Sequence, residues 1–178
     1  MSGTMYYVNR IVGFLYRISL TTGRATGIGR LSLRPFGTFV YSSRLYGASS
    51  ATGSSAISIY TISASSAATS VVGSINIGLP SSENGRGGFA VLGSTIYFCS
   101  TGSVSGLYRI TPNTWSITRV GGYGSHVLEM GSCAFKGSTL YAMGRNTSGS
   151  SKLYRISTSS GAATEIGNSI TLNALESV

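Results

Sequence analysis

The sequence predicts an all-β chain, and three observations support this fold class. Four near-copies of one two-strand segment are spread over the 178 residues. Each copy has two short apolar stretches on either side of a turn rich in Ser and Gly, a pattern typical of a β-hairpin. The composition agrees, because Gly is abundant at 25 residues and Pro is scarce at 3. Tight turns between short strands use glycine, and strand interiors exclude proline.

The repeated segment is clearest at residues 153–167, which read LYRISTSSGAATEIG. Residues 15–29 (LYRISLTTGRATGIG) and 107–121 (LYRITPNTWSITRVG) repeat it, and residues 59–73 (IYTISASSAATSVVG) form a degenerate copy. The hairpin tyrosine recurs at intervals of 44, 48 and 46 residues, as Tyr16, Tyr60, Tyr108 and Tyr154. A period in the mid-forties with four short strands per repeat is the signature of a β-propeller blade.

The first repeat provides three strands of its blade. They are expected at residues 4–9, 13–20 and 24–31, which are rich in aliphatic residues and tyrosine. Gly23 supplies the positive φ that the second hairpin turn needs. The innermost strand is missing, and residues 172–178 align with the innermost strands of the other repeats. We therefore expect this C-terminal strand to pair with the N-terminal blade and close the propeller.

The remaining repeats each contain all four strands. We expect a single β-propeller domain over residues 1–178, with four blades of four antiparallel strands. The blades are residues 1–31 with 172–178, 36–73, 87–121 and 131–167. Residues 47–55 are expected to form a loose loop in the second blade. Two assemblies fit this organisation: a closed four-bladed monomer, or an eight-bladed ring of two chains whose tails cross.

The hairpin resembles the repeat of bacterial and viral β-propeller proteins that carry an LYxID-xxTG-xAT-xIG segment. The resemblance covers all four repeats and implies the propeller fold. It implies no single function, because propellers include enzymes, lectins and scaffolds. The aspartate of that pattern is absent, so any metal or polar role of its side chain is expected to be lost. The residues in its place are Ser19, Ser63, Thr111 and Ser157.

Charge and hydropathy limit the classes of partner and location. Thirteen Lys and Arg face four acidic residues, which gives a net charge of +9. A basic balance favours polyanions such as nucleic acid, but these cations are scattered, as on a solvated basic surface. No apolar run approaches the ~18 residues of a membrane span, so membrane insertion is not expected. The N-terminus lacks the pattern of a secretory signal, which favours a virion or the cytoplasm.

Catalysis, cofactors and metals are not expected. His126 is the single histidine, and the nearest carboxylate in sequence is Glu129. Nucleophilic catalysis needs a base that a third group orients. The chain has no Asp, and Cys99 and Cys133 have no zinc-binding spacing. The two cysteines are expected to be buried thiols, with a single disulfide as the alternative.

The candidate contact residues lie in loops and turns, where binding residues are most often found. One end of the blades, where the second-to-third-strand loops and the interblade loops emerge, carries Arg34, Arg86, Tyr123, His126 and Arg145. The hairpin turns emerge at the opposite end, where Trp115 replaces the turn glycine of the third repeat. This Trp is expected either to lie over its own hairpin or to serve as an exposed contact anchor.

The function predicted from these observations is that of a non-enzymatic structural or adhesion propeller. It would mediate protein–protein or surface contacts, or self-assembly, as a phage virion component such as a decoration or tail-associated protein. The composition suits an extracellular protein, and release by lysis would reconcile it with the missing signal. A lectin-like propeller that binds glycans is the first alternative, and a basic polyanion-binding module is the second.

Overall fold

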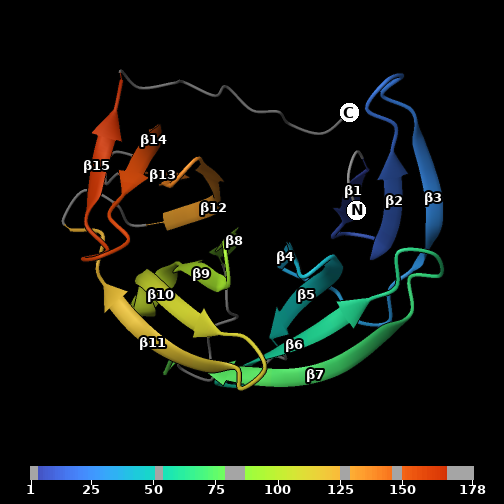
Figure 1. The fold of residues 1–178 in the computed structure, drawn as a ribbon, viewed down its shortest axis with the longest axis horizontal. Helices are drawn as coiled ribbons and strands as arrows, with labels where there is room; N and C mark the ends of the chain where they lie inside the picture. The colour runs from blue at the N-terminus through green and yellow to red at the C-terminus, as the bar shows by residue number, and fades with distance from the viewer. Residues whose placement is uncertain (1–3, 51–53, 79–86, 125–128, 146–149, 168–178) are drawn as a thin grey trace. The chain divides into compact units, whose positions relative to one another are not determined.

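The computed structural model describes residues 4–50, 54–78, 87–124, 129–145 and 150–167. Regular structure in this part of the chain is β, apart from one 3₁₀ turn at Gly102–Val104. The strands form four antiparallel sheets, and every sheet is built from strands consecutive in the chain. The predicted fold class, a four-bladed β-propeller, is confirmed (Figure 1).

The first compact unit comprises Met1–Gly85 together with Asn113–Trp115. Its first sheet has the order β1-β2-β3, with β1 at Met5–Asn9, β2 at Phe14–Ile18 and β3 at Ala25–Arg30. Its second sheet has the order β4-β5-β6-β7 (Figure 1), with strands Gly37–Tyr41, Arg44–Ser50, Ala56–Ile62 and Thr69–Asn76. Each sheet is therefore a meander of adjacent hairpins.

The second compact unit comprises Arg86–Pro112 and Ser116–Val178. In its first sheet β8 to β11 lie in chain order, as Gly87–Leu92, Thr95–Ser100, Gly106–Thr111 and Ser116–Gly121. In its second sheet β12 to β15 do the same, as Glu129–Lys136, Thr139–Arg145, Ser151–Ile156 and Ala163–Ile166.

The predicted strands agree with the structure except in the second sheet. There β5 continues to Ser50, so the loose loop predicted from residue 47 is wrong in its first part. Gly47 and Ala48 look like loop residues in the sequence, but Gly47 pairs with Tyr60 of β6. A Cβ at Gly47 would lie 2.6 Å from the Tyr60 ring, so the strand needs a small residue there. The predicted closing strand at 172–178 lies outside the described residues.

Each unit has a hydrophobic core between its two sheets. In the first unit the core includes Leu15, Leu45, Tyr60 and Ile62. The hydroxyl of Tyr60 donates a hydrogen bond to the carbonyl oxygen of Leu33 at 3.3 Å. In the second unit the buried cluster comprises Ala90, Tyr97, Cys99, Leu107, Tyr123, Leu140, Ala142, Tyr154 and Ile156. The repeated hairpin tyrosine is thus a packing residue in the second to fourth sheets.

A serine caps the hairpin turn in three of the sheets. The side-chain oxygens of Ser19, Ser63 and Ser157 each accept a hydrogen bond from the backbone N–H three residues later, at 3.2 Å. An aspartate would accept the same bond. The expectation that this position has lost its polar role is therefore wrong, because the serine hydroxyl retains it.

In three of the four hairpin repeats, the closing glycine lies where the next hairpin turn approaches most closely. A Cβ at Gly29 would lie 3.0 Å from the carbonyl oxygen of Ser66, and one at Gly121 would lie 1.9 Å from that of Ser160. A Cβ at Gly73 would lie 2.1 Å from Cδ1 of Trp115. We call this contact between a closing glycine and the next hairpin turn a joint. It occurs three times, and it explains why the repeat ends in glycine.

Candidate functional site

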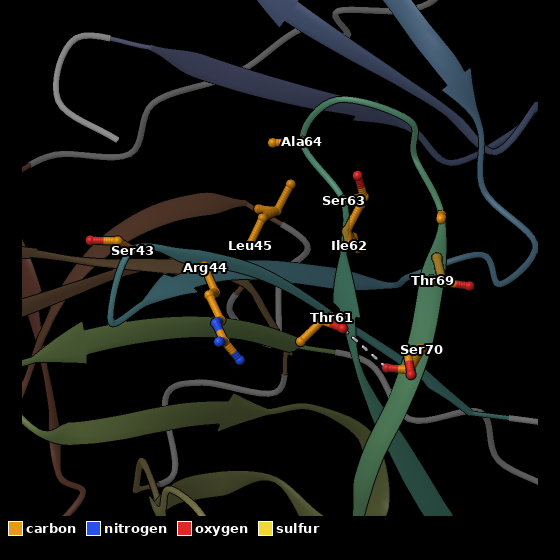
Figure 2. A pocket seen from close by; sticks show the side chains of 10 residues that line it. Ser43, Arg44, Leu45, Thr61, Ile62, Ser63, Ala64, Thr69 and Ser70 are labelled. Atoms are coloured by element: carbon orange, nitrogen blue, oxygen red, sulfur yellow. Dashed lines mark hydrogen bonds between the residues drawn. The ribbon is translucent and has the colours of Figure 1, made fainter.

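The candidate site is a pocket at the hairpin-turn end of the second sheet. Its volume is about 450 Å³, and it is lined by Ser43, Arg44, Leu45, Thr61, Ile62, Ser63, Ala64, Ala68, Thr69 and Ser70. Three segments supply these residues: the start of β5, the end of β6 with the turn that follows, and the start of β7 (Figure 2). All of them lie within the first compact unit.

The floor of the pocket is apolar. Leu45 and Ile62 are directly opposite each other in the β5–β6 pair, so their side chains lie on one face of the sheet. Both are 4% exposed and belong to the core of the first unit. They are held by the core, so this floor is a rigid surface for an apolar ligand group.

Several hydroxyl groups in the pocket already have partners. Thr61 Oγ1 donates to the carbonyl oxygen of Ser70 at 3.4 Å, the dashed line of Figure 2. Thr69 Oγ1 lies 2.5 Å from Ser32 Oγ, and the Ser63 hydroxyl caps its turn. These bonds fix the walls of the pocket and leave the oxygen atoms with further lone pairs to accept bonds.

Arg44 is the charged group of the pocket. It is exposed, and in Figure 2 its guanidinium extends away from Leu45, on the side of Thr61 and Ser70. Within the described part of the chain Lys152 forms an ion pair with Glu165, whereas Arg44 forms none. Its five N–H groups can therefore receive a carboxylate, sulfate or phosphate from a ligand.

The lining residues of the pocket offer a guanidinium and several hydroxyl groups to a ligand. Its lining contains no histidine, carboxylate or thiol that could act as a general base beside a hydroxyl nucleophile. Among the described residues, no cluster of three or more His, Cys, Asp or Glu could hold a metal ion.

Trp115, one of the predicted contact residues, lies beside the second sheet. Its ring centroid is 5.8 Å from that of Tyr46, with an interplanar angle of 59°. It also covers Gly73, and it is half-buried. Trp115 therefore neither lies over its own hairpin nor is a fully exposed contact anchor. It packs on residues of another sheet and remains partly exposed.

Tyr123 lies in the core rather than on an exposed loop. It is 3% exposed, and its hydroxyl donates a hydrogen bond to the carbonyl oxygen of Gly106 at 2.6 Å. Burial, and then the nearby thiols of Cys99 and Cys133, raise the pKa of Tyr123 above its ordinary value. The phenol therefore stays protonated and serves as a structural donor.

Of the other predicted contact residues, the structure describes Arg34 in the first compact unit and Arg145 in the second. Arg34 is exposed, and its side chain passes near Gly13. Arg145 ends β13, where its backbone pairs with Glu129 and Ser151. Arg86 and His126 lie outside the described residues. Arg44 is not recognisable as a site residue in the sequence, because a single Arg after a Ser-Ser turn has no distinguishing pattern.

The solved structures that share the fold include the following two. Hydrazine synthase from Kuenenia stuttgartiensis aligns with a TM-score of 0.57 at 17% identity, over 92% of this chain and 46% of that one. TolB from Acinetobacter baumannii aligns with a TM-score of 0.55 at 12% identity, over 91% of this chain and 40% of that one. The chain therefore spans less than half the length of either, and the likeness shows the fold alone.

Comparisons with family models and with curated proteins found no match. The described residues include no helix of the length and apolar character required to cross a bilayer.

Proposed function

We propose that this chain is a non-enzymatic structural and adhesive β-propeller that mediates contacts with another protein or a surface, as a component of a phage virion. The hairpin repeat, which resembles that of bacterial and viral propellers, supports this proposal. So does the composition, which is rich in Ser, Thr and Gly and only 10% charged.

The observation that carries the proposed contact role is a pair of aliphatic residues at the β1–β2 loop. Ile11 is 83% exposed and Val12 is 46% exposed, next to each other at the tip of a loop. Two exposed aliphatic side chains that lie together are suited to contact with a protein partner. We expect mass spectrometry of purified lysis particles from the source to detect the chain. Its absence from such particles would remove the virion assignment.

A second candidate function, glycan binding, is favoured by the turn-end pocket. Arg44 can hold an acidic group of a sugar, and Thr61, which lies on the same side of the sheet as the guanidinium, can hydrogen-bond a sugar hydroxyl. The pocket has no aromatic lining, and stacking on aromatic rings is what neutral sugars usually require. The ligand class is therefore glycans with carboxylate or sulfate groups, and an array of neutral, carboxylated and sulfated glycans tests it.

We expect Arg44→Ala to weaken binding of acidic glycans about tenfold or more, because a charge-assisted hydrogen bond contributes roughly 1.5–3 kcal/mol. Titration of the purified chain with the best array ligand would measure this loss. Arg155→Ala is the matched control: Arg155 is also exposed and on a strand, its loss lowers the net charge equally, and it lies outside the pocket.

Equal losses for the two variants would contradict the pocket assignment. They would instead support diffuse polyanion binding by the net charge of +9, which should weaken steeply with salt.

A further inference from the structure

The two cysteines of the chain lie at one place in the second unit, although they are 34 positions apart in sequence. Cys99 is on β9, directly opposite Gly88 of β8, and Cys133 is on β12 of the next sheet. A Cβ at Gly88 would lie 2.7 Å from the backbone nitrogen of Cys133. Opposed residues of an antiparallel pair project to the same face, so Cys99 projects toward β12 as well.

The side chains complete this arrangement. Both residues are free thiols in the structure, and the neighbouring Cys99 side chain raises the pKa of the Cys133 thiol. Cys99 is fully buried in the cluster between the two sheets, and half-buried Cys133 packs against that cluster. Gly88, which has no Cβ, thus allows β8 and β12 to approach each other closely beside Cys99 and Cys133.

We propose that Cys99 and Cys133 form an oxidation site whose disulfide covalently joins the third and fourth sheets. A small-molecule disulfide is the co-reactant. The thiolate of half-buried Cys133 attacks it, one thiol of the reagent leaves, and a mixed disulfide forms on Cys133. The Cys99 thiol then loses its proton and attacks the Cys133 sulfur, and the second reagent thiol leaves. Two protein thiols are oxidised while one reagent disulfide is reduced to two thiols.

The environment of the two cysteines explains why their oxidation is expected to be slow. The neighbouring Cys99 side chain, and then burial, raise the pKa of Cys133 well above its ordinary value. The thiolate is the attacking species, so the exchange is slow at neutral pH. The site is therefore expected to close over hours rather than seconds, after the sheets have packed.

The test uses the full chain, reduced, purified and incubated with oxidised glutathione at mildly alkaline pH. We expect the monomer mass to fall by about 2 Da and a non-reducing peptide map to contain a cross-linked peptide with Cys99 and Cys133. A cross-link between cysteines 34 positions apart should raise the melting temperature by about 5–10 °C, and a reductant should reverse this rise.

Cys99→Ala and Cys133→Ser are the control variants, one for the fully buried thiol and one for the half-buried thiol. Both should show no rise in melting temperature with oxidant, and Cys99→Ala should retain glutathione on Cys133. Three results would overturn the proposal: a stable glutathione adduct on Cys133 of the unaltered chain, disulfide-linked dimers, or oxidation that occurs only after denaturation. These outcomes are independent of ligand binding at the Arg44 pocket.

Discussion

Replacement of Gly121 by alanine is expected to lower the free energy of unfolding by about 3–5 kcal/mol. The added Cβ would lie 1.9 Å from the carbonyl oxygen of Ser160 and 2.9 Å from its carbonyl carbon. Both are backbone atoms, so no side-chain rotation relieves the overlap. The β14–β15 turn would have to move away from β11, which would open the core around Leu107 and Tyr154.

Gly122→Ala is the matched control for this prediction. Its added Cβ would meet only the tip of the flexible Arg119 side chain, at 3.3 Å, so we expect a change within about 0.5 kcal/mol. Gly29→Ala should fall between the two, at about 1 kcal/mol, because its nearest atom is 3.0 Å away. Urea unfolding followed by tryptophan fluorescence measures all three variants. Equal stability of the Gly121 and Gly122 variants would show that this turn does not pack on β11.

The strands and their order could be predicted because their signals are local. Apolar residues alternate within each strand, and a Gly or Ser turn separates it from the next, so the LYRI hairpin can be recognised wherever it recurs. The loop predicted to begin at Gly47 is wrong for a physical reason. A small residue in a loop and a small residue below a tyrosine ring look the same in sequence.

The candidate site could not be predicted in the same way. The Arg44 pocket is formed by three segments of one sheet, and nothing in the sequence marks the space between them. Tyr123 stands among glycines, as a loop residue would, yet the third and fourth sheets enclose it. The proximity of Cys99 and Cys133 depends on how two sheets are offset against each other, which is a tertiary property. The sequence pattern therefore predicts where the turns lie, but not which side chains pack together or which pocket forms between the segments.

The second large effect is expected at Gly73, where alanine should cost about 2–4 kcal/mol. The added Cβ would lie 2.1 Å from Cδ1 and 2.7 Å from Cγ of Trp115. These atoms are at the base of the indole, which cannot turn away without losing its contact with Tyr46. Trp115 is also held at φ +54°, a conformation that Gly23 and Gly161 occupy in the equivalent turns.

Trp115→Gly should therefore rescue the Gly73→Ala variant. Glycine suits the positive φ and has no side chain at the joint, so the double variant would resemble the turns of the first and fourth sheets. Trp115→Gly alone should cost about 1–3 kcal/mol, because the contact with Tyr46 is lost. In that background Gly73→Ala should cost less than about 0.5 kcal/mol, which gives a coupling energy near 2 kcal/mol or more.

The double-mutant cycle, measured by urea unfolding and far-ultraviolet circular dichroism, separates the joint from general effects of either substitution. Circular dichroism is needed because Trp115 is the single tryptophan of the chain. Costs that simply add would mean that Gly73 and Trp115 do not meet in solution. Non-additive costs would show that the hairpin turn packs against the closing glycine even where the turn residue is tryptophan, the largest side chain.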